Sequence, residues 1–162
     1  MLIPAYAFGK PVVITEFGSR TYQGADTTTE GIAGDITDLR PNLPVIVSYL
    51  INKIITSLFD IQRPPPRMRL KKGNYIRDED LQARELIDQI NVLESAGVEG
   101  AFIMTFVSPV APYNDNPQYD FDMNSYSLVK TLTGGKHGTT YPDMLWEPKK
   151  SFKAVGDYYA KH

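Results

Sequence analysis

Two short apolar runs without polar alternation constrain the fold of this chain more than any other feature. The first, PVVIT at 11–15, leads directly into Glu16, and the second lies within VEGAFIMTFVSP at 98–109. Strands of parallel sheets, which are covered on both faces, have such uninterrupted runs, whereas half-buried antiparallel strands alternate. The pattern therefore predicts two strands that are buried on both faces, over 11–15 and 98–108.

A helix is predicted between the two strands, since Asp78 can cap it and Gly97 follows its end. Its inner face is marked by apolar residues at helical spacing, namely Ala83, Leu86, Ile87, Ile90 and Leu93. A last helix is predicted with Pro148 in an early position and with an inner face formed by Phe152, Val155 and Tyr159. The order strand, helix, strand, helix predicts a parallel α/β unit with a right-handed crossover.

Four further segments carry local patterns. The capping box Thr27-x-x-Glu30, with the apolar residues after it, predicts a helix over 27–39. Residues 43–61 are apolar on one helical face and polar on the other, which predicts an amphipathic helix rather than a membrane span. Binding of this segment to a membrane surface is the alternative. Three prolines at 64–66 predict an extended connector, and 125–132 is predicted to be a short helical stretch.

The composition excludes several classes of function. The chain has 162 residues, 42% hydrophobic and 22% charged, and a net charge of −2, which fits one globular domain rather than a nucleic-acid binder. It has no cysteine and only two histidines, so thiolate metal sites are excluded and no metal or cofactor is predicted. No signal-peptide pattern is found, and a cytoplasmic protein is expected. The domain spans 1–162, with 42–77 as an insertion or linker region within it.

The carboxylate of Glu16 directly follows the first apolar run. In parallel α/β folds, ligands bind beyond the carboxyl ends of the strands. We therefore predict that Glu16 points out of the sheet into a ligand site. The alternative is that Glu16 only pairs with Arg20 or with an amide of a neighbouring loop.

The two strand segments also resemble a known family. GKPVVITEFG (9–18) resembles the seventh strand of the retaining (β/α)8 glycoside hydrolases, the clan in which a nucleophilic glutamate closes that strand. GVEGAFIMTFVSP (97–109) resembles the eighth strand of the same barrels.

The C-terminal part of the chain resembles a narrower group. YNDNPQYDFDMNSYSLVK (113–130) and GTTYPDMLWEPKKSFKAVGDYYA (138–160) are similar to the tails of glycosidase-like barrel proteins, some of which carry an "abortive infection" label. EFGSRTYQGA (16–25) and GNYIRDEDLQARELIDQ (73–89) fit the same group. The resemblance covers most of the chain except 42–62.

The resemblance implies an α/β fold, namely a partial (β/α)8 TIM barrel that comprises the last two βα units, strands 7 and 8, with a helical insertion. A complete barrel of this type needs roughly 250 residues. In the family, the acid/base glutamate follows the fourth strand, which is outside the region of resemblance. The chain is therefore expected to be a C-terminal fragment, a truncated gene product, or one part of a barrel that another chain completes. Open strand edges then predict self-association or pairing with the missing N-terminal half of the barrel.

The resemblance implies that Glu16 is the catalytic nucleophile. Aromatic faces can pack against the C–H groups of sugar rings, and carboxylates can bind sugar hydroxyls or a cation. The alternative is that the aromatic residues among the predicted substrate-binding residues belong to the core, that Asp120 and Asp122 order their own loop, and that Trp146 anchors the last helix. The predicted substrate-binding residues are Arg20, Tyr22, Phe106, Tyr113, Asp120, Asp122 and Trp146.

These features predict a glycoside hydrolase-related protein that acts on an oligo- or polysaccharide by the retaining mechanism. The chain has no identifiable acid/base residue at the position that the family uses. The alternative is therefore a non-catalytic carbohydrate-binding or interaction module derived from such a barrel. The predicted partner is a carbohydrate, with no nucleic acid and no membrane span.

Overall fold

The structure is a computed structural model, and the residues that it describes are 9–27, 32, 36–38, 68–70 and 75–161. The predicted helix at 43–61 and the proline connector at 64–66 lie outside these residues, as does most of the 42–77 region.

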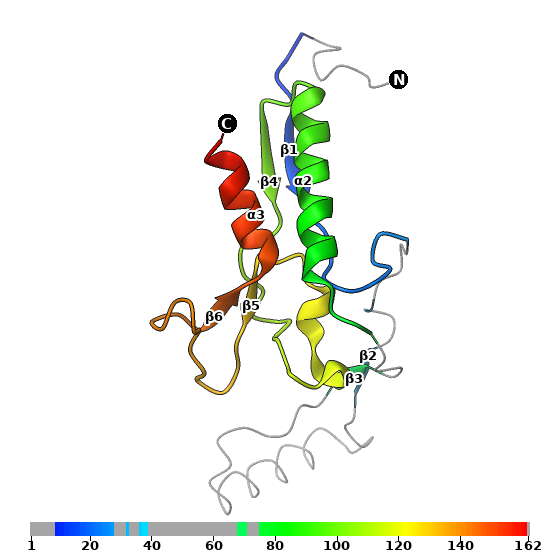
Figure 1. Cartoon of the computed structure of the whole chain (residues 1–162). Helices are drawn as coiled ribbons and strands as arrows, with labels where there is room; N and C mark the ends of the chain where they lie inside the picture. Colours follow the sequence, from blue (N-terminus) through cyan, green and yellow to red (C-terminus); the bar gives the residue numbers. More distant parts are fainter. Residues whose placement is uncertain (1–8, 28–31, 33–35, 39–67, 71–74, 162) are drawn as a thin grey trace, which may run out of the picture.

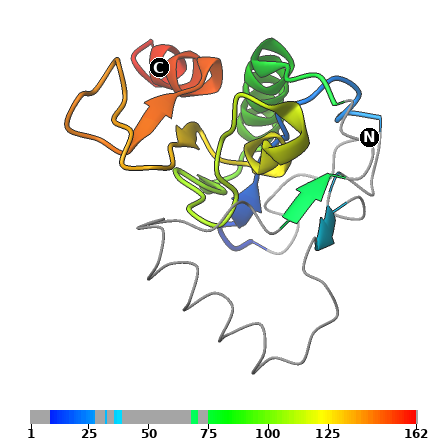
Figure 2. The same cartoon turned by 90° about the horizontal axis from the view of Figure 1, so that it is seen from below.

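The two apolar runs form a parallel pair of strands, as predicted. Strand β1 (Val13–Phe17) pairs with β4 (Gly100–Ile103), and Val13 lies opposite Gly100. Helix α2 (Glu79–Ser95) precedes β4, and α3 (Lys150–Tyr159) follows it. The predicted order of two strands and two main helices is thus confirmed, although β4 is shorter than the 98–108 strand that was expected. Both helices lie on the same side of the strand pair (Figures 1 and 2).

Helix α2 begins and ends as its sequence predicts. The carboxylate of Asp78 accepts a hydrogen bond from the backbone N–H of Leu81 at 2.8 Å. Gly97, just past the end, has a φ of +70°, a left-handed conformation that glycine adopts without steric cost. The inner face packs Leu86 and Ile90 against Val155 of α3, and Phe17 and Ile103 of the strands pack against this cluster.

Helix α3 differs from the prediction at its start and on its inner face. It begins at Lys150 with Lys149 as the N-cap residue, so that Pro148 lies before the helix in a strand. Val155 is buried as predicted, but the prediction is wrong for Tyr159, which is 54% exposed. The neighbouring Tyr158 packs against the core instead.

The opposite face of the strand pair is exposed. Val13 is 48% exposed and Phe102 is 63% exposed, although both lie in apolar strand segments. Among the described residues, neither strand has a second partner. The expectation of burial on both faces therefore holds only for the face that α2 and α3 cover. Parallel strands in folded proteins are normally covered on both faces.

Two small antiparallel sheets replace helices that the sequence predicted. Strand β2 (Ile36–Asp38) pairs with β3 (Met68–Leu70), so the helix expected over 27–39 is wrong over its last residues. Gly31 and Gly34 each lower the stability of a helix there by about 1 kcal/mol relative to alanine. Strand β5 (Val129–Thr131) pairs with β6 (Trp146–Pro148), and no helix forms over 125–132. Instead, the N–H groups of Leu128 and Val129 donate to the carbonyls of Thr105 and Phe106.

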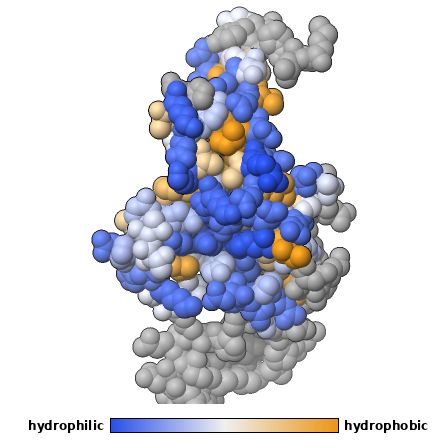
Figure 3. All heavy atoms as spheres, viewed as in Figure 1, coloured by the Kyte–Doolittle hydropathy of each residue, from blue (hydrophilic) through white to orange (hydrophobic). Residues whose placement is uncertain are grey.

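Most of the remaining described chain lies beyond the carboxyl ends of β1 and β4. Figure 1 shows β5, β6 and two short 3₁₀ helices there, η2 (Pro117–Tyr119) and η3 (Phe121–Asn124). A second core cluster lies in this half and contains Tyr22, Ile32, Leu70 and Met123. In Figure 3, hydrophilic residues cover the middle of the molecule, and apolar residues show between the two helices above it.

Candidate functional site

The carboxylate of Glu16 lies at an open cavity of about 310 Å³ at the ends of β1 and β4. The cavity is lined by Glu16, Phe17, Gly18, Met104 and Tyr126. Its volume is at the lower end of the range of small-molecule sites in proteins. The two strand ends thus meet at one site, as their parallel pairing requires.

A β-bulge determines the direction of the Glu16 side chain. Ile14 lies opposite Ala101 and Phe17 lies opposite Ile103, so that Thr15 and Glu16 together face the single residue Phe102. In a regular strand, Glu16 would share the face of Ile14, because side chains alternate. The extra residue turns Phe17 towards the helices and leaves Glu16 exposed. Bulges often redirect a side chain beside an active site.

Gly18 allows the ends of the two strands to approach closely. A Cβ atom at Gly18 would lie 2.7 Å from the carbonyl oxygen of Met104 and 3.0 Å from Cβ of Tyr126. The N–H of Met104 donates to the carbonyl of Phe17 at 2.8 Å. The glycine is therefore required by the backbone geometry of the cavity wall.

Aromatic and cationic groups border this region. The guanidinium of Arg20 lies over the ring of Tyr126, 5.5 Å from its centroid. Phe106, which is 44% exposed, meets Trp146 edge to face at 5.3 Å between centroids. Trp146 also contacts Phe152 of α3. This contact fits the interpretation that Trp146 anchors the last helix.

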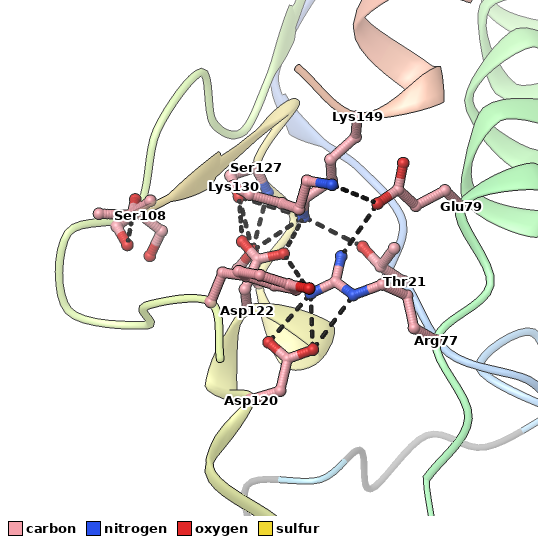
Figure 4. A network of polar contacts seen from close by, with 12 residues as sticks. Thr21, Arg77, Glu79, Ser108, Asp120, Asp122, Ser127, Lys130 and Lys149 are labelled. Atoms are coloured by element: carbon pink, nitrogen blue, oxygen red, sulfur yellow. Dashed lines mark hydrogen bonds and ion pairs between the residues drawn. The ribbon is translucent and has the colours of Figure 1, made fainter. Parts of the chain in front are cut away.

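The carboxylate of Asp122 lies in a buried polar cluster rather than at the cavity (Figure 4). Asp122 is fully buried, and its Oδ2 atom lies 2.9 Å from Nζ of Lys149 and 2.9 Å from a guanidinium nitrogen of Arg77. The hydroxyls of Ser125 and Ser127 also donate to it. With four protein donors and no exposed surface, Asp122 does not fit the predicted substrate-binding role.

Asp120 is held in the same cluster. It is 3% exposed, and Arg77 donates to both of its carboxylate oxygens at 2.8–3.1 Å. Burial raises the pKa of Asp120 even though Arg77 acts in the opposite direction. For Arg77, burial lowers the pKa, but the charges of Asp120 and Asp122 together outweigh it and leave the pKa raised. The interpretation that the two aspartates order their own loop fits these contacts better than sugar binding.

Lys149 completes the cluster and was not singled out from the sequence. Its Nζ atom is buried among Thr21, Ser125 and Ser127, whose hydroxyls lie 3.1–3.3 Å away, and Asp122. Burial lowers the pKa of Lys149, and the charge of Asp122 opposes this shift. A lysine beside a helix start gives no sequence signal of burial, since lysines are almost always exposed.

The two remaining predicted tyrosines lie away from Glu16. Tyr22 is 3% exposed and contacts Tyr75 edge to face, so its ring is part of the core and does not fit a sugar-binding role. Tyr113 lines a second cavity, with Arg77 4.9 Å and Lys130 5.2 Å from its ring centroid. Tyr126 lines the Glu16 cavity and lies under the guanidinium of Arg20, but the sequence did not predict it as a site residue.

Glu147 on β6 orders the loop that borders the second cavity. Its carboxylate accepts the backbone N–H groups of Thr139 at 2.6 Å and Thr140 at 3.2 Å, together with both threonine hydroxyls. The Thr140 hydroxyl, followed by these amides, lowers the pKa of Glu147 to about 2. The carboxylate therefore stays charged and bonded to the loop at neutral pH.

The loop is expected to lose this anchor in acid. Because the folded pKa of Glu147 lies below its ordinary value of 4.5, the contribution to stability is complete above pH 4.5 and is lost as the pH falls towards about 2. We expect the amide signals of Thr139 and Thr140 in NMR spectra to titrate with a midpoint well below 4.5. A Glu147→Gln variant should show no such titration, and a wild-type midpoint near 4.5 would contradict the assignment.

No protein-family model matches the chain, and no curated protein matches its sequence. None of the described helices is both long enough and apolar enough to cross a membrane. Within the same residues, no group of three or more histidines and acidic residues is placed to hold a metal ion.

Proposed function

We propose that this chain forms part of a retaining glycoside hydrolase barrel and that Glu16 is its nucleophile. The observation that carries the proposal is the bulge in β1, which directs Glu16 to the exposed face beside Met104, at the end of a parallel neighbour. In parallel barrels, catalytic residues come from the carboxyl ends of the strands. The resemblance of 9–18 and 97–109 to the last two barrel strands supports the same assignment.

The chemistry requires Glu16 to be ionised. Its carboxylate attacks the anomeric carbon, a glycosyl–enzyme ester forms, and the bond to the leaving oxygen breaks as a second carboxyl group protonates that oxygen. The second group then takes a proton from water, which attacks the anomeric carbon and releases Glu16. The exposure of Glu16 at a cavity suits the first step, because an ion pair or an apolar cover would weaken the nucleophile.

The second carboxyl group must lie about 5–5.5 Å from the first in a retaining enzyme. Among the described residues that line the cavity, Glu16 is the only acid. Asp120 and Asp122 are buried and bonded to Arg77 and Lys149. We therefore assign the acid/base role to a further strand of the barrel, which would cover the exposed face beside Val13 and Phe102.

A carbohydrate substrate is supported by the groups beside the cavity. Tyr126 lines it directly, and the half-exposed ring of Phe106 lies two residues beyond Met104. Both rings can pack against sugar C–H groups, and the hydroxyl of Tyr126 can bind a sugar hydroxyl.

Covalent labelling tests the proposal. In the polypeptide that carries the complete barrel, a 2-deoxy-2-fluoroglycoside with a good leaving group should label the peptide that contains Glu16, as seen by mass spectrometry. Glu16→Gln should lose the label and reduce turnover by about 10³-fold or more. Glu99→Gln, at the opposite end of β4, is the matched control and should keep both. A Glu16→Gln variant as active as the wild type would overturn the nucleophile assignment.

A non-catalytic carbohydrate-binding module is the second candidate, favoured by the single acid at the cavity. The chain has one tryptophan, so Trp146 fluorescence reports on binding near Phe106. A saturable change with oligosaccharides, without release of product, would support this candidate over the enzyme. No fluorescence response together with covalent labelling of Glu16 would reject it.

A further inference from the structure

The second cavity, of about 340 Å³, shares no lining residue with the cavity at Glu16. It is formed by residues from 113–115, 130–133 and 136–139, together with Glu147. Most of these side chains are polar, and three of them carry basic nitrogen atoms, namely Lys130, Lys136 and His137. Two segments of the chain, 130–133 and 136–139, thus bring basic groups to one cavity.

Two of the basic groups are held in place by neighbouring residues. Nζ of Lys130 lies 3.3 Å from a carboxylate oxygen of Glu79, above the Tyr113 ring, and its side chain is only 20% exposed. Nδ1 of His137 lies 2.6 Å from the carbonyl oxygen of Pro142. Because a carbonyl only accepts hydrogen bonds, Nδ1 carries the proton. The structure gives Nε2 of His137 no hydrogen bond to a described residue.

The acidic groups of the cavity are already engaged. Glu147 accepts four hydrogen bonds from Thr139 and Thr140. Asp115 accepts the Tyr113 hydroxyl at 2.9 Å, and its other oxygen lies 3.9 Å from Nζ of Lys136. This last contact is long and exposed, and such ion pairs contribute little. Lys136 therefore retains donor capacity for a ligand, and Nε2 of His137 is not bonded to a described residue.

The cavity wall is ordered before any ligand binds. Gly134 and Gly135 have φ values of +77° and +68°, and the N–H of Lys136 donates to the carbonyl of Thr133, which closes a tight turn. Glu147 fixes the other end of the loop. A site whose walls are already in place loses less conformational entropy on binding.

We propose that this cavity binds the anionic group, a carboxylate or a phosphate ester, of a small hydrophilic ligand. Lys136 and His137 contact the anion at the mouth, and Lys130 supports it from the base. Asn114, Asp115 and Thr133 supply polar groups for the rest of the ligand. This site does not depend on the role of Glu16.

A matched ligand series tests the proposal. D-glucose, D-glucuronate and D-glucose 6-phosphate share one ring and differ in the group at C6. With inorganic phosphate as a fourth probe, they are titrated into the chain while the imidazole nitrogen signals of His137 are followed by NMR. His137→Gln assigns these signals, since the only other histidine is His162.

At least one of the two charged sugars is expected to shift the His137 signals saturably, and neutral glucose is not. Tighter binding of D-glucuronate would identify a carboxylate as the preferred group, and tighter binding of D-glucose 6-phosphate would identify a phosphate. Lys136→Gln should weaken this binding by about tenfold, the usual size of one hydrogen bond to a charged group. Lys153→Gln, an exposed lysine of α3, and Glu16→Gln should both leave it unchanged.

Three results would overturn the proposal. The first is that no charged sugar shifts the signals even at the millimolar concentrations that a weak site requires. The second is an equal response to glucose. The third is a response to inorganic phosphate alone that Lys136→Gln leaves unchanged, which would indicate unspecific anion binding at the surface.

Discussion

Replacing Lys149 by methionine is expected to lower the free energy of unfolding by about 3 kcal/mol, among the largest effects of a single substitution in this chain. The ammonium group is fully buried 2.9 Å from Asp122, which is also fully buried. Removing one partner of a buried ion pair leaves the other charge without its counter-ion in a medium of low polarity. Arg77 still contacts Asp122, so the loss should lie at the lower end of the usual range.

Thermal unfolding followed by circular dichroism measures this effect. A loss of about 3 kcal/mol corresponds to a midpoint that is lower by about 10 °C in a domain of this size. The control is Lys153→Met, because Lys153 forms an exposed pair with Asp157 and its loss should change the midpoint little. Similar midpoints for the two variants would show that the buried pair does not stabilise the fold.

A double-mutant cycle separates the ion pair from the rest of the cluster. Asp122→Asn keeps an oxygen that can accept from Ser125 and Ser127 but removes the negative charge. If Lys149 and Asp122 act as a pair, the double variant should lose less unfolding free energy than the two single variants lose together. The expected difference is about 1 kcal/mol or more. Additive effects would assign the stability to the hydroxyl contacts instead.

The second large effect is expected at the exposed face of β1 and β4. Val13 and Phe102 expose apolar surface there, and both strands have unpaired edges within the described chain. Unpaired edges and exposed apolar faces favour association. We expect the isolated 18.2 kDa chain to associate at micromolar concentration, so that sedimentation gives at least twice this mass.

Phe102→Lys should shift the population to monomer, because a charge on this face repels a second copy and binds water. Val110→Lys is the matched control, since Val110 is 91% exposed on the loop after β4, away from the strand pair. The control should associate like the wild type. The prediction would be wrong if the wild-type chain remained monomeric. It would also be wrong if the Phe102→Lys and Val110→Lys variants associated equally.

The sequence predicted the elements whose signals are local. The cap at Asp78 and the left-handed Gly97 set the ends of α2, and the two apolar runs identified β1 and β4 as a parallel pair. Glu16 was expected at the end of β1, and it is exposed at a cavity there. The ends of α2 and the positions of the two strands along the chain were predictable because neighbouring residues determine them.

Features that depend on distant residues were not predicted. The bulge at Thr15 and Glu16 exists only relative to β4, so no pattern within 11–17 reveals it. Gln82 lies outside the predicted apolar face of α2 but is fully buried, because it donates to the carbonyls of Ser19 and Ser127. Val129 joins a strand because Phe106 and β6 offer backbone partners. The charges of Asp122 and Lys149 can be buried only because the two side chains pair, and neither residue shows this from its own neighbours in the sequence.

The contact between Thr21 and Lys149 has a consequence for how the chain acquires its structure during synthesis. These residues are 128 positions apart, and Nζ of Lys149 is 3.1 Å from the threonine hydroxyl. At the usual rates of translation, Lys149 emerges about 6–26 s after Thr21. Asp122 follows Thr21 by 101 positions and is itself absent for most of that interval, so the buried cluster at the end of β1 can form only once Lys149 has emerged.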